Sequence, residues 1–336
     1  MGITMTDIAK AAGASVATVG RVIHKNGYVS QEARERIEKA IAELGYVPDR
    51  SARILKCQKS GIIGSLVVQN PNSLYYRVND SIQAAARASG FELLTMEAQP
   101  GQHMEEGIIR NFIGLHVDGL VITSDLSVTA EHFIQLRQAK IPVVAVERGY
   151  PEQGVDSLLV QDREACRDAV LRIAEKGHER IAFIGALPVH NVERLRLEGY
   201  LTALKEAGLP ESRELIRLLP DYSAEGARCA AEELFALPCP PTAIFCAADT
   251  LAAGVLQTAY NLNMRVPEDL SLVGYDDVLS RLLSPPVDSV GLLLDGIGEQ
   301  VMEMLKKRME SWEIPAVCKS IGTAYQDRGT VRERNK

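Results

Sequence analysis

The chain has 336 residues, of which 46% are hydrophobic, 24% charged and 5% aromatic, enough for two or three compact domains with mostly aliphatic cores. No run approaches the ~20 apolar residues of a membrane helix, and the N-terminus lacks the basic and apolar regions of a secretory signal. The net charge of −7 is unevenly distributed along the chain. Residues 1–60 carry 10 Lys and Arg against 6 Asp and Glu, and the remaining 276 residues carry 27 against 38. A basic head on an acidic body is expected where one small segment meets phosphate.

The six cysteines are dispersed along the chain. They form no C-x-x-C pair and no histidines cluster with them, which disfavours a disulfide framework and a zinc site. We therefore expect reduced, mostly buried thiols in a cytoplasmic protein with no metal and no cofactor. The cysteines are Cys57, Cys166, Cys229, Cys239, Cys246 and Cys318.

The N-terminal segment predicts three short helices, over residues 5–12, 16–23 and 31–44. Each follows a residue whose side chain caps helix N-termini, and glycines end the first and the third. Two short helices around a glycine-bearing turn are the pattern of a helix-turn-helix. Three helices around a tiny core could also form a plain helical subdomain. The caps are Thr4, Ser15 and Ser30, and the terminating glycines are Gly13 and Gly45.

The second helix of a helix-turn-helix enters the major groove of DNA with its N-terminal side chains at the base edges. Here Val16 and Ala17 can contact thymine methyl groups, and Arg21 has the planar donors that match guanine. The alternative for Arg21 is a phosphate-contacting or merely solvated side chain. The side chains expected to touch phosphate and set the register are Thr4, Thr6, Ser15, Thr18, Asn26, Ser30 and Tyr46.

A short hinge is predicted after this head. Pro48 stops the third helix, and a helix of one or two turns, too short to be stable alone, can begin directly after it. On it Leu55 would be exposed, with Ala52 and Lys56 nearby, which fits a wedge that enters the minor groove and kinks a base step. The alternative is a plain linker with one incidental leucine.

Short aliphatic runs alternate with helix-length amphipathic segments from residue 61 onward. This alternation predicts an α/β fold with parallel sheets covered by helices, and about ten strands suit two lobes better than one sheet. The predicted strands are Ile62–Val68, Glu92–Met96, Gly119–Thr123, Val143–Val146, Leu158–Val160, Ile181–Gly185, Ala243–Cys246, Ser271–Gly274 and Ser289–Leu292. The helices between them include Val78–Ser89, Ala130–Gln138, Arg163–Lys176, Arg194–Ala207 and Ala224–Leu237.

Ligands of such sheets bind beyond the carboxyl ends of the strands. Several carboxylates, an arginine and aromatic residues converging there suit a ligand rich in hydroxyl groups, such as a sugar. The alternative is that each aspartate only caps the next helix, and for Asp162 and Asp249 both can hold. The polar residues at predicted strand ends are Asn70 to Tyr75, Thr123 to Asp125, Glu147, Arg148, Asp162, Asp249, Asp276 and Asp277.

Two other classes of function fit less well. An enzyme is disfavoured because the chain contains no G-x-S-x-G, Walker, H-E-x-x-H or clean G-x-G-x-x-G motif, and the glycines around residues 291–298 have the wrong spacing for phosphate. The adjacent Asp276 and Asp277 could mimic an acid/base pair, but neighbouring side chains usually diverge. A solute-binding protein for transport or sensing would suit the body, and the basic head opposes it.

The head closely resembles that of the lactose/galactose-repressor family. The match runs without gaps from T-M-T-D-I-A-K-A-A-G-A-S-V-A-T-V-G-R-V-I-H through Y-V-S-Q-E-A-R-E-R-I to L-G-Y-V-P-D-R-S-A-R-I-L-K. It continues in the body with G-H-E-R-I-A-F-I-G, R-L-E-G-Y and V-P-E-D-L-S-L-V-G-Y-D-D. The resemblance implies a homodimer on a pseudopalindromic operator, with Val16, Ala17 and Arg21 as base readers and Leu55 inserted at a central step. Gly20 and His24 depart from the family pattern, which leaves the operator sequence open.

The resemblance also implies a body like a periplasmic sugar-binding protein, with a small effector between two lobes joined by three crossovers. It gives a head over 1–47, a hinge over 48–60 and a body over 61–336, with lobe 1 at about 61–161 and 292–320 and lobe 2 at about 162–291 and 321–336. His190 and Val192 replace the Arg and Thr of the purine-binding member, which favours a carbohydrate effector. The residues implied as effector contacts are Leu74, Tyr75, Asp162, His190, Val192, Arg196, Tyr222, Asp249 and Asp276, beside Arg148 from the strand ends.

Overall fold

The computed structural model describes residues 3–23, 27–46, 59–68, 74–99, 102, 104–123, 128–188 and 191–334. The chain forms two compact units, Met1–Ser60 and Gly61–Lys336.

The N-terminal unit holds three helices, α1 (Met5–Ala12), α2 (Val16–Ile23) and α3 (Gln31–Leu44), with the bounds that the caps predicted. The Thr4 hydroxyl accepts a hydrogen bond from the Asp7 amide at 3.4 Å, and the Asp7 carboxylate accepts one from the Thr4 amide at 2.9 Å. This reciprocal pair satisfies two amides at the helix start. Buried aliphatic side chains from all three helices form the core, among them Ile8, Val19 and Ile37.

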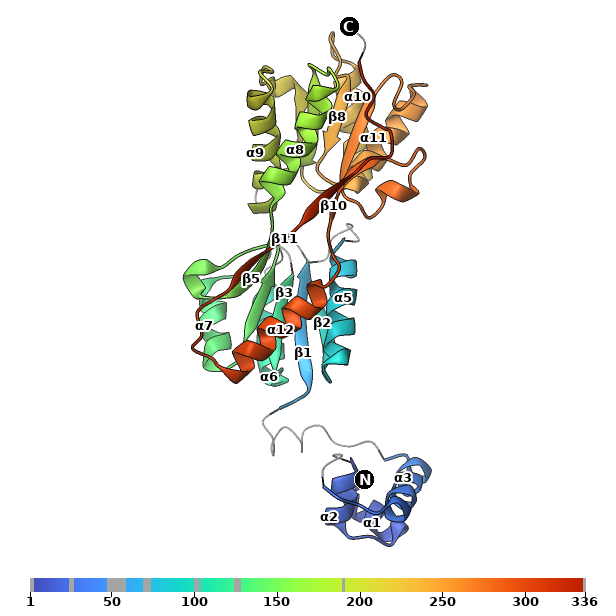
Figure 1. Cartoon of the computed structure of the whole chain (residues 1–336), viewed down its shortest axis with the longest axis vertical. Coiled ribbons are helices and arrows are strands. Elements are labelled where there is room, and N and C mark those ends of the chain that lie inside the picture. Colours follow the sequence, from blue (N-terminus) through green and yellow to red (C-terminus); the bar gives the residue numbers. More distant parts are fainter. Residues whose placement is uncertain are drawn as a thin grey trace. The chain divides into compact units, whose positions relative to one another are not determined.

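The body contains two six-stranded sheets covered by helices on both faces (Figure 1). The first has the order β11-β5-β4-β3-β1-β2 and the second the order β12-β10-β9-β8-β6-β7. The strand pairs are parallel except for β10 with β12. The α/β fold with mostly parallel sheets is therefore confirmed, and one edge strand of the second sheet is antiparallel.

The first sheet and its helices make up lobe 1. Helices α5 and α12 share one hydrophobic core with the sheet, and α6 and α7 share a second core with it. The strands are β1 (Ile62–Val68), β2 (Glu92–Ala98), β3 (Gly119–Thr123), β4 (Val143–Val146), β5 (Asp156–Val160) and β11 (Cys318–Ile321). The helices are α5 (Leu74–Ala88), α6 (Glu105–Gly114), α7 (Ala130–Gln138) and α12 (Ile297–Glu310).

The second sheet and its helices make up lobe 2. Its strands are β6 (Ile181–Ala186), β7 (Ile216–Leu219), β8 (Ala243–Cys246), β9 (Ser271–Asp276), β10 (Asp288–Leu292) and β12 (Thr323–Gln326). Its helices are α8 (Asp162–Glu175), α9 (Asn191–Glu206), α10 (Ala224–Phe235) and α11 (Asp249–Asn261). The chain passes between the lobes three times along its described residues, from β5 to α8, from β10 to α12 and from β11 to β12.

Glycines let helix pairs approach closely in both lobes. A Cβ added at Gly254 in α11 would lie 2.1 Å from the Ala224 carbonyl oxygen of α10. A Cβ at Gly298 in α12 would lie 2.1 Å from the Ser81 carbonyl oxygen of α5. Gly298, one of the glycines around residues 291–298, therefore serves the close packing of α12 on α5.

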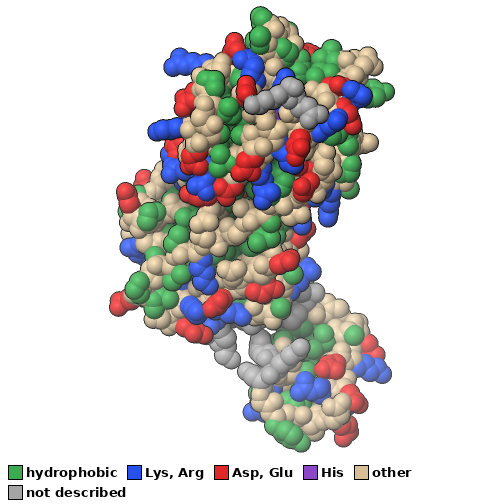
Figure 2. Space-filling model, turned by 45° about the horizontal axis from the view of Figure 1, so that its top comes forward, with side chains coloured by type: hydrophobic (Ala, Val, Ile, Leu, Met, Phe, Trp, Pro, Cys, Tyr) green, Lys and Arg blue, Asp and Glu red, His purple; other side chains and the backbone are tan. Residues whose placement is uncertain are grey.

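The surface of the body carries charged side chains and three exposed cysteines. On the face shown in Figure 2, side chains of both charge signs intermix over the body. The expectation of mostly buried cysteines is wrong, because Cys229, Cys239 and Cys318 are exposed, on α10, in a loop and on the edge strand β11. Cys57 lies outside the described residues. Within the described ranges, no helix has the length and apolarity to cross a membrane.

Candidate functional site

Helix α2 exposes the three side chains predicted to read bases. Val16 is 44% exposed, and Ala17 and Arg21 are exposed beside it. On the opposite side of the helix Val19 and Val22 are buried in the core of the head. A helix of two turns thus presents a small apolar surface followed by an arginine, a combination that suits thymine methyl groups and guanine in a major groove.

Three of the hydroxyls predicted to touch phosphate hold helix ends in the structure. Ser15 accepts a hydrogen bond from the Thr18 amide at 3.1 Å, and its hydroxyl also bonds that of Thr18 at 2.8 Å. Ser30 caps α3 through the Ala33 amide, and Thr4 caps α1. Such ends gather backbone amides where phosphate binds, so capping and phosphate contact are compatible here.

Some of the remaining predicted DNA contacts lie within the described residues, and others lie outside them. Thr6 is exposed on α1, and Tyr46 is half-buried against the core of the head. Four predicted residues lie outside the described ranges, namely Asn26, Ala52, Leu55 and Lys56. Their roles stay predictions.

In lobe 2, Arg196 is the centre of a buried charge cluster. It is 4% exposed, and it donates to Asp162 Oδ1 at 2.8 Å, to Asp276 Oδ1 at 3.3 Å and to the Ala247 carbonyl oxygen at 2.7 Å. These partners follow β5, end β9 and follow β8. The cluster therefore brings together residues at the carboxyl ends of strands from both sheets, as predicted for a ligand site.

The surroundings of Arg196 fix its orientation. Its guanidinium lies over the ring of Tyr275, 4.1 Å from the centroid, and the Tyr275 hydroxyl donates to Asp162 Oδ1 at 3.0 Å. Burial alone would lower the pKa of Arg196, but Asp276 and Asp162 raise it well above its usual value. Asp276 has a left-handed backbone with φ of 90°. Such strain, of order 1–3 kcal/mol, is found where structure holds a functional group in place.

Lobe 1 contributes Tyr75 and Glu147 to the same region. Glu147 directly follows β4, is 6% exposed and has φ of 73°. Burial, followed by the charges of Asp162 and Asp276, raises the pKa of Glu147 to about 8, although Arg196 and a hydrogen bond with Tyr75 act to lower it. Charged groups of both lobes therefore interact where the lobes meet, and this region around Tyr75, Glu147, Asp162, Arg196 and Asp276 is called the cleft below. The sequence places Glu147 at the end of a predicted strand, but the effector contact predicted there is its neighbour Arg148.

Several predicted effector contacts have other partners in the structure. The Arg148 guanidinium lies over the ring of Tyr150, 5.0 Å from the centroid. Leu74 is buried in the core of lobe 1. Asp249 accepts hydrogen bonds from the amides of residues 278, 279 and 280 and from the Ser289 hydroxyl at 2.7–3.0 Å. The Asp249 carboxylate thus positions the loop that follows Asp276.

A second missed residue is Glu193, near the start of α9. The Tyr222 hydroxyl donates to Glu193 Oε1 at 3.2 Å, and burial raises the pKa of Tyr222 while Arg196 lowers it. Val192 is 5% exposed, and His190 lies outside the described residues. Only the helical position of Glu193, three residues before Arg196, could have indicated it from the sequence.

The arrangement is suited to binding. Asp276 faces Arg196, whereas Asp277 accepts from the Ser280 hydroxyl at 2.7 Å and from Arg328 at 2.6 Å. The two adjacent carboxylates diverge, as expected, and do not form an acid/base pair. Among the described residues, no group of His, Cys, Asp and Glu is arranged to hold a metal ion.

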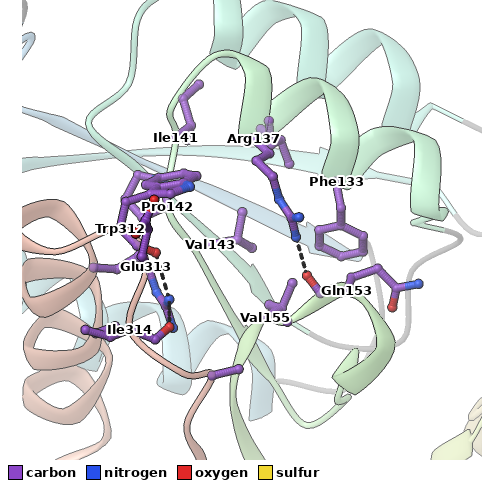
Figure 3. A pocket seen from close by; sticks show the side chains of 14 residues that line it. Phe133, Arg137, Ile141, Pro142, Val143, Gln153, Val155, Trp312, Glu313 and Ile314 are labelled. Carbon is purple, nitrogen blue, oxygen red and sulfur yellow. Dashed lines mark hydrogen bonds between the residues drawn. The ribbon is translucent and has the colours of Figure 1, made fainter.

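A cavity of about 320 Å³ lies elsewhere in lobe 1 (Figure 3). It is lined by Phe133 of α7, by Val143 at the start of β4 and by Trp312 and Ile314 after α12. Figure 3 shows Arg137 donating to the Gln153 carbonyl oxygen at its edge. The cavity lies at the opposite end of β4 from Glu147, so it is separate from the cleft between the lobes.

Comparisons with known proteins cover the whole chain. Residues 4–49 match the model of bacterial regulatory proteins of the lacI family, and residues 170–331 match a periplasmic binding protein-like domain. The repressor PurR of Vibrio atlanticus (strain LGP32) is 30% identical over 99% of both chains. The ribose operon repressor of Escherichia coli (strain K12) is 32% identical over 91% of this chain and 93% of its own.

The similar solved structures are also those of transcription regulators. The transcriptional regulator CelR in complex with cellobiose has a TM-score of 0.72 and 28% identity, over 98% of this chain and 99% of that one. The Lac repressor dimer bound to operator and an anti-inducer has a TM-score of 0.85 over 99% of this chain and 100% of that one, and at 23% identity it supports the fold. The resemblance seen in the sequence is thus confirmed, and the chain belongs to the lacI family of bacterial transcription regulators.

Proposed function

We propose that the chain is a cytoplasmic homodimeric repressor that binds a pseudopalindromic operator and is controlled by a carbohydrate or carbohydrate derivative held between its lobes. The observation that carries this proposal is the buried cluster in which Arg196 bonds Asp162 and Asp276 on lobe 2, with the buried Glu147 of lobe 1 beside it. A ligand placed among these groups touches both lobes at once. It can therefore favour one arrangement of the lobes over another by its difference in affinity for the two.

On the DNA side, we assign base reading to the exposed face of α2. Val16 and Ala17 contact thymine methyl groups, and Arg21 pairs with a guanine. The helix-capping hydroxyls of Thr4, Ser15 and Ser30, with Thr6, Thr18, Asn26 and Tyr46, contact phosphate. Ala52, Leu55 and Lys56 act in the minor groove.

On the effector side, we assign direct contacts with the ligand to Arg196, Asp276, Asp162 and Tyr75. Tyr222 and Val192 add contacts on the lobe 2 side. Arg196 offers guanidinium donors, and the carboxylates accept hydroxyl groups. Asp249 acts through the loop after β9, and Leu74, Arg148 and His190 complete the predicted set. The sugar named with CelR in its solved complex supports a carbohydrate here.

Operator binding by an Arg21→Ala variant tests the DNA half. Operators selected from a random duplex library with the full chain are titrated by fluorescence anisotropy. Loss of a bidentate base contact is expected to cost about 1–3 kcal/mol and to relax one base position. Arg36→Ala is the matched control, because Arg36 is an exposed arginine on α3. An Arg21→Ala loss that is equal on selected and random DNA would remove the base-reading role.

A sugar panel tests the effector half. Each sugar is added to the protein in a thermal-shift assay and then to the protein–operator complex. The proposal expects at least one sugar to raise the melting temperature and to change operator affinity. Sugars that bind without any change in operator affinity would make the body a solute binder, which was the alternative that the sequence left open.

A further inference from the structure

The described part of the cleft has more negative than positive groups. The carboxyl groups of Asp162 and Asp276 on lobe 2 and of Glu147 on lobe 1 interact with the Arg196 guanidinium, and Glu193 accepts from Tyr222 beside them. Asp162 and Asp276 both pair with Arg196, so the cluster already carries one surplus negative charge. Glu147 and Glu193 add to that surplus when ionised. An anionic effector, such as a sugar phosphate, is therefore disfavoured.

Among the described residues of this cleft, two carboxylate oxygens lack a hydrogen-bond partner. They are Oε2 of Glu147 and Oε2 of Glu193, and both atoms are buried. Glu147 is 6% exposed, and its left-handed backbone holds the side chain at the end of β4. Buried polar atoms in native structures are nearly always paired, so an orphaned one needs an explanation such as an absent ligand.

The groups that face Glu147 come from both lobes. Asp162 and Asp276 disfavour its ionised form, whereas Arg196 and the Tyr75 hydroxyl favour it. With burial as the largest cause, its pKa lies at about 8, so the carboxyl carries a proton at neutral pH. A cation placed against it would reverse the balance and favour the carboxylate. Glu147 is thus poised to exchange its proton for a bound cation.

We propose that the effector carries a protonated amine that binds Glu147, while its hydroxyl groups donate to Glu193 and Asp276, as an amino sugar would. The inference rests on the proposed function and narrows its effector class. On binding, the Glu147 O–H bond breaks, the proton goes to solvent, and an ammonium N–H donates to the carboxylate. No oxidant or further reactant is needed.

Matched sugar triplets test this inference on the full-length protein. Glucose, glucosamine and N-acetylglucosamine share one ring and differ in a hydroxyl, an amine and a neutral amide, and the galactose and mannose triplets are used in the same way. Thermal shift ranks the members at pH 7. We expect one amine to bind at least tenfold more tightly than its hydroxyl and acetyl partners.

Proton release gives a readout that needs no variant. Isothermal titration of the preferred amine in phosphate and in MOPS, which differ in ionisation enthalpy, is expected to report release of well over half a proton. This follows because a carboxyl of pKa about 8 is protonated in about nine of ten molecules at pH 7. Glu147→Gln is expected to abolish both the release and the amine preference. Glu105→Gln, another buried glutamate of lobe 1, is expected to change neither.

The outcomes separate this inference from the proposed function. Binding of neutral sugars without any preference for an amine overturns the inference and leaves the sugar-controlled repressor standing. Binding of an amine without proton release also overturns it. If no member of any triplet binds, both the inference and the carbohydrate effector fail.

Discussion

Replacing Arg196 with methionine tests the buried cluster on which the cleft depends. Methionine keeps much of the length of the side chain and can still pack on the Tyr275 ring, but it removes every guanidinium donor. In the native chain these donors bond Asp162, Asp276 and the Ala247 carbonyl oxygen. The variant leaves two carboxylates, both about 2% exposed, without their cation.

The expected cost follows from that burial. Removing one partner of a buried ion pair costs about 3–5 kcal/mol, because the remaining charge is uncompensated. The second carboxylate and the lost carbonyl contact place Arg196→Met at the upper part of that range. Adding Asp276→Asn removes one stranded charge, so the double variant should recover about 1–3 kcal/mol relative to additivity.

Urea unfolding followed by circular dichroism measures the free energy of unfolding of each variant. Arg194→Met is the matched control, because Arg194 lies on the same helix, is half-exposed and pairs with Glu198 at 2.6 Å. A surface pair of this kind contributes about 0–1 kcal/mol. The reasoning is refuted if Arg196→Met costs no more than Arg194→Met, or if Asp276→Asn in the Arg196→Met background recovers nothing.

Three further substitutions test other parts of the structure. Gly20→Ala should stabilise the head by about 1 kcal/mol in thermal unfolding, because Gly20 lies inside α2 with free space at its Cβ position; a loss would show that α2 needs the glycine. Gly254→Ala should lower the melting temperature of the body, because its methyl group would meet the Ala224 carbonyl; an unchanged temperature would contradict the close packing of α10 and α11. Glu147→Gln should stabilise the effector-free protein increasingly from pH 5 to pH 8, up to a ceiling of about 5 kcal/mol, because folding raises the pKa of Glu147 to about 8 and makes its ionisation costly. A gain that is the same at both pH values would count against that pKa.

The fold was predictable where local chemistry determines it. Thr4, Ser15 and Ser30 mark helix starts by their hydroxyls, and Gly13 and Gly45 mark helix ends by their left-handed backbones. The bounds of all three helices of the head follow from these residues. The buried strands were predictable because both of their faces are apolar, whereas the strands β7, β11 and β12 are only four residues long and partly exposed, and the sequence pattern does not reveal them.

The site was predictable only in part, for a geometric reason. Arg196 and Asp276 lie in distinctive motifs, but the hydrogen bond between them spans 80 positions of the chain. Which of two adjacent residues faces the cleft depends on the backbone at the strand end. There the left-handed conformation of Glu147 accompanies its burial in the cleft, while Arg148 lies over Tyr150. Sequence alone gives no sign of such a turn in a residue other than glycine.

Operator affinity measured with and without a bound sugar tests the central claim most directly. The full-length protein is titrated into a labelled selected operator at moderate salt, first alone and then with a sugar that raises its melting temperature. A coupled switch predicts a change of about 5–150-fold in operator Kd, with random duplex little affected. An operator Kd that the bound sugar leaves unchanged, or that equals the Kd for random duplex, would contradict the account.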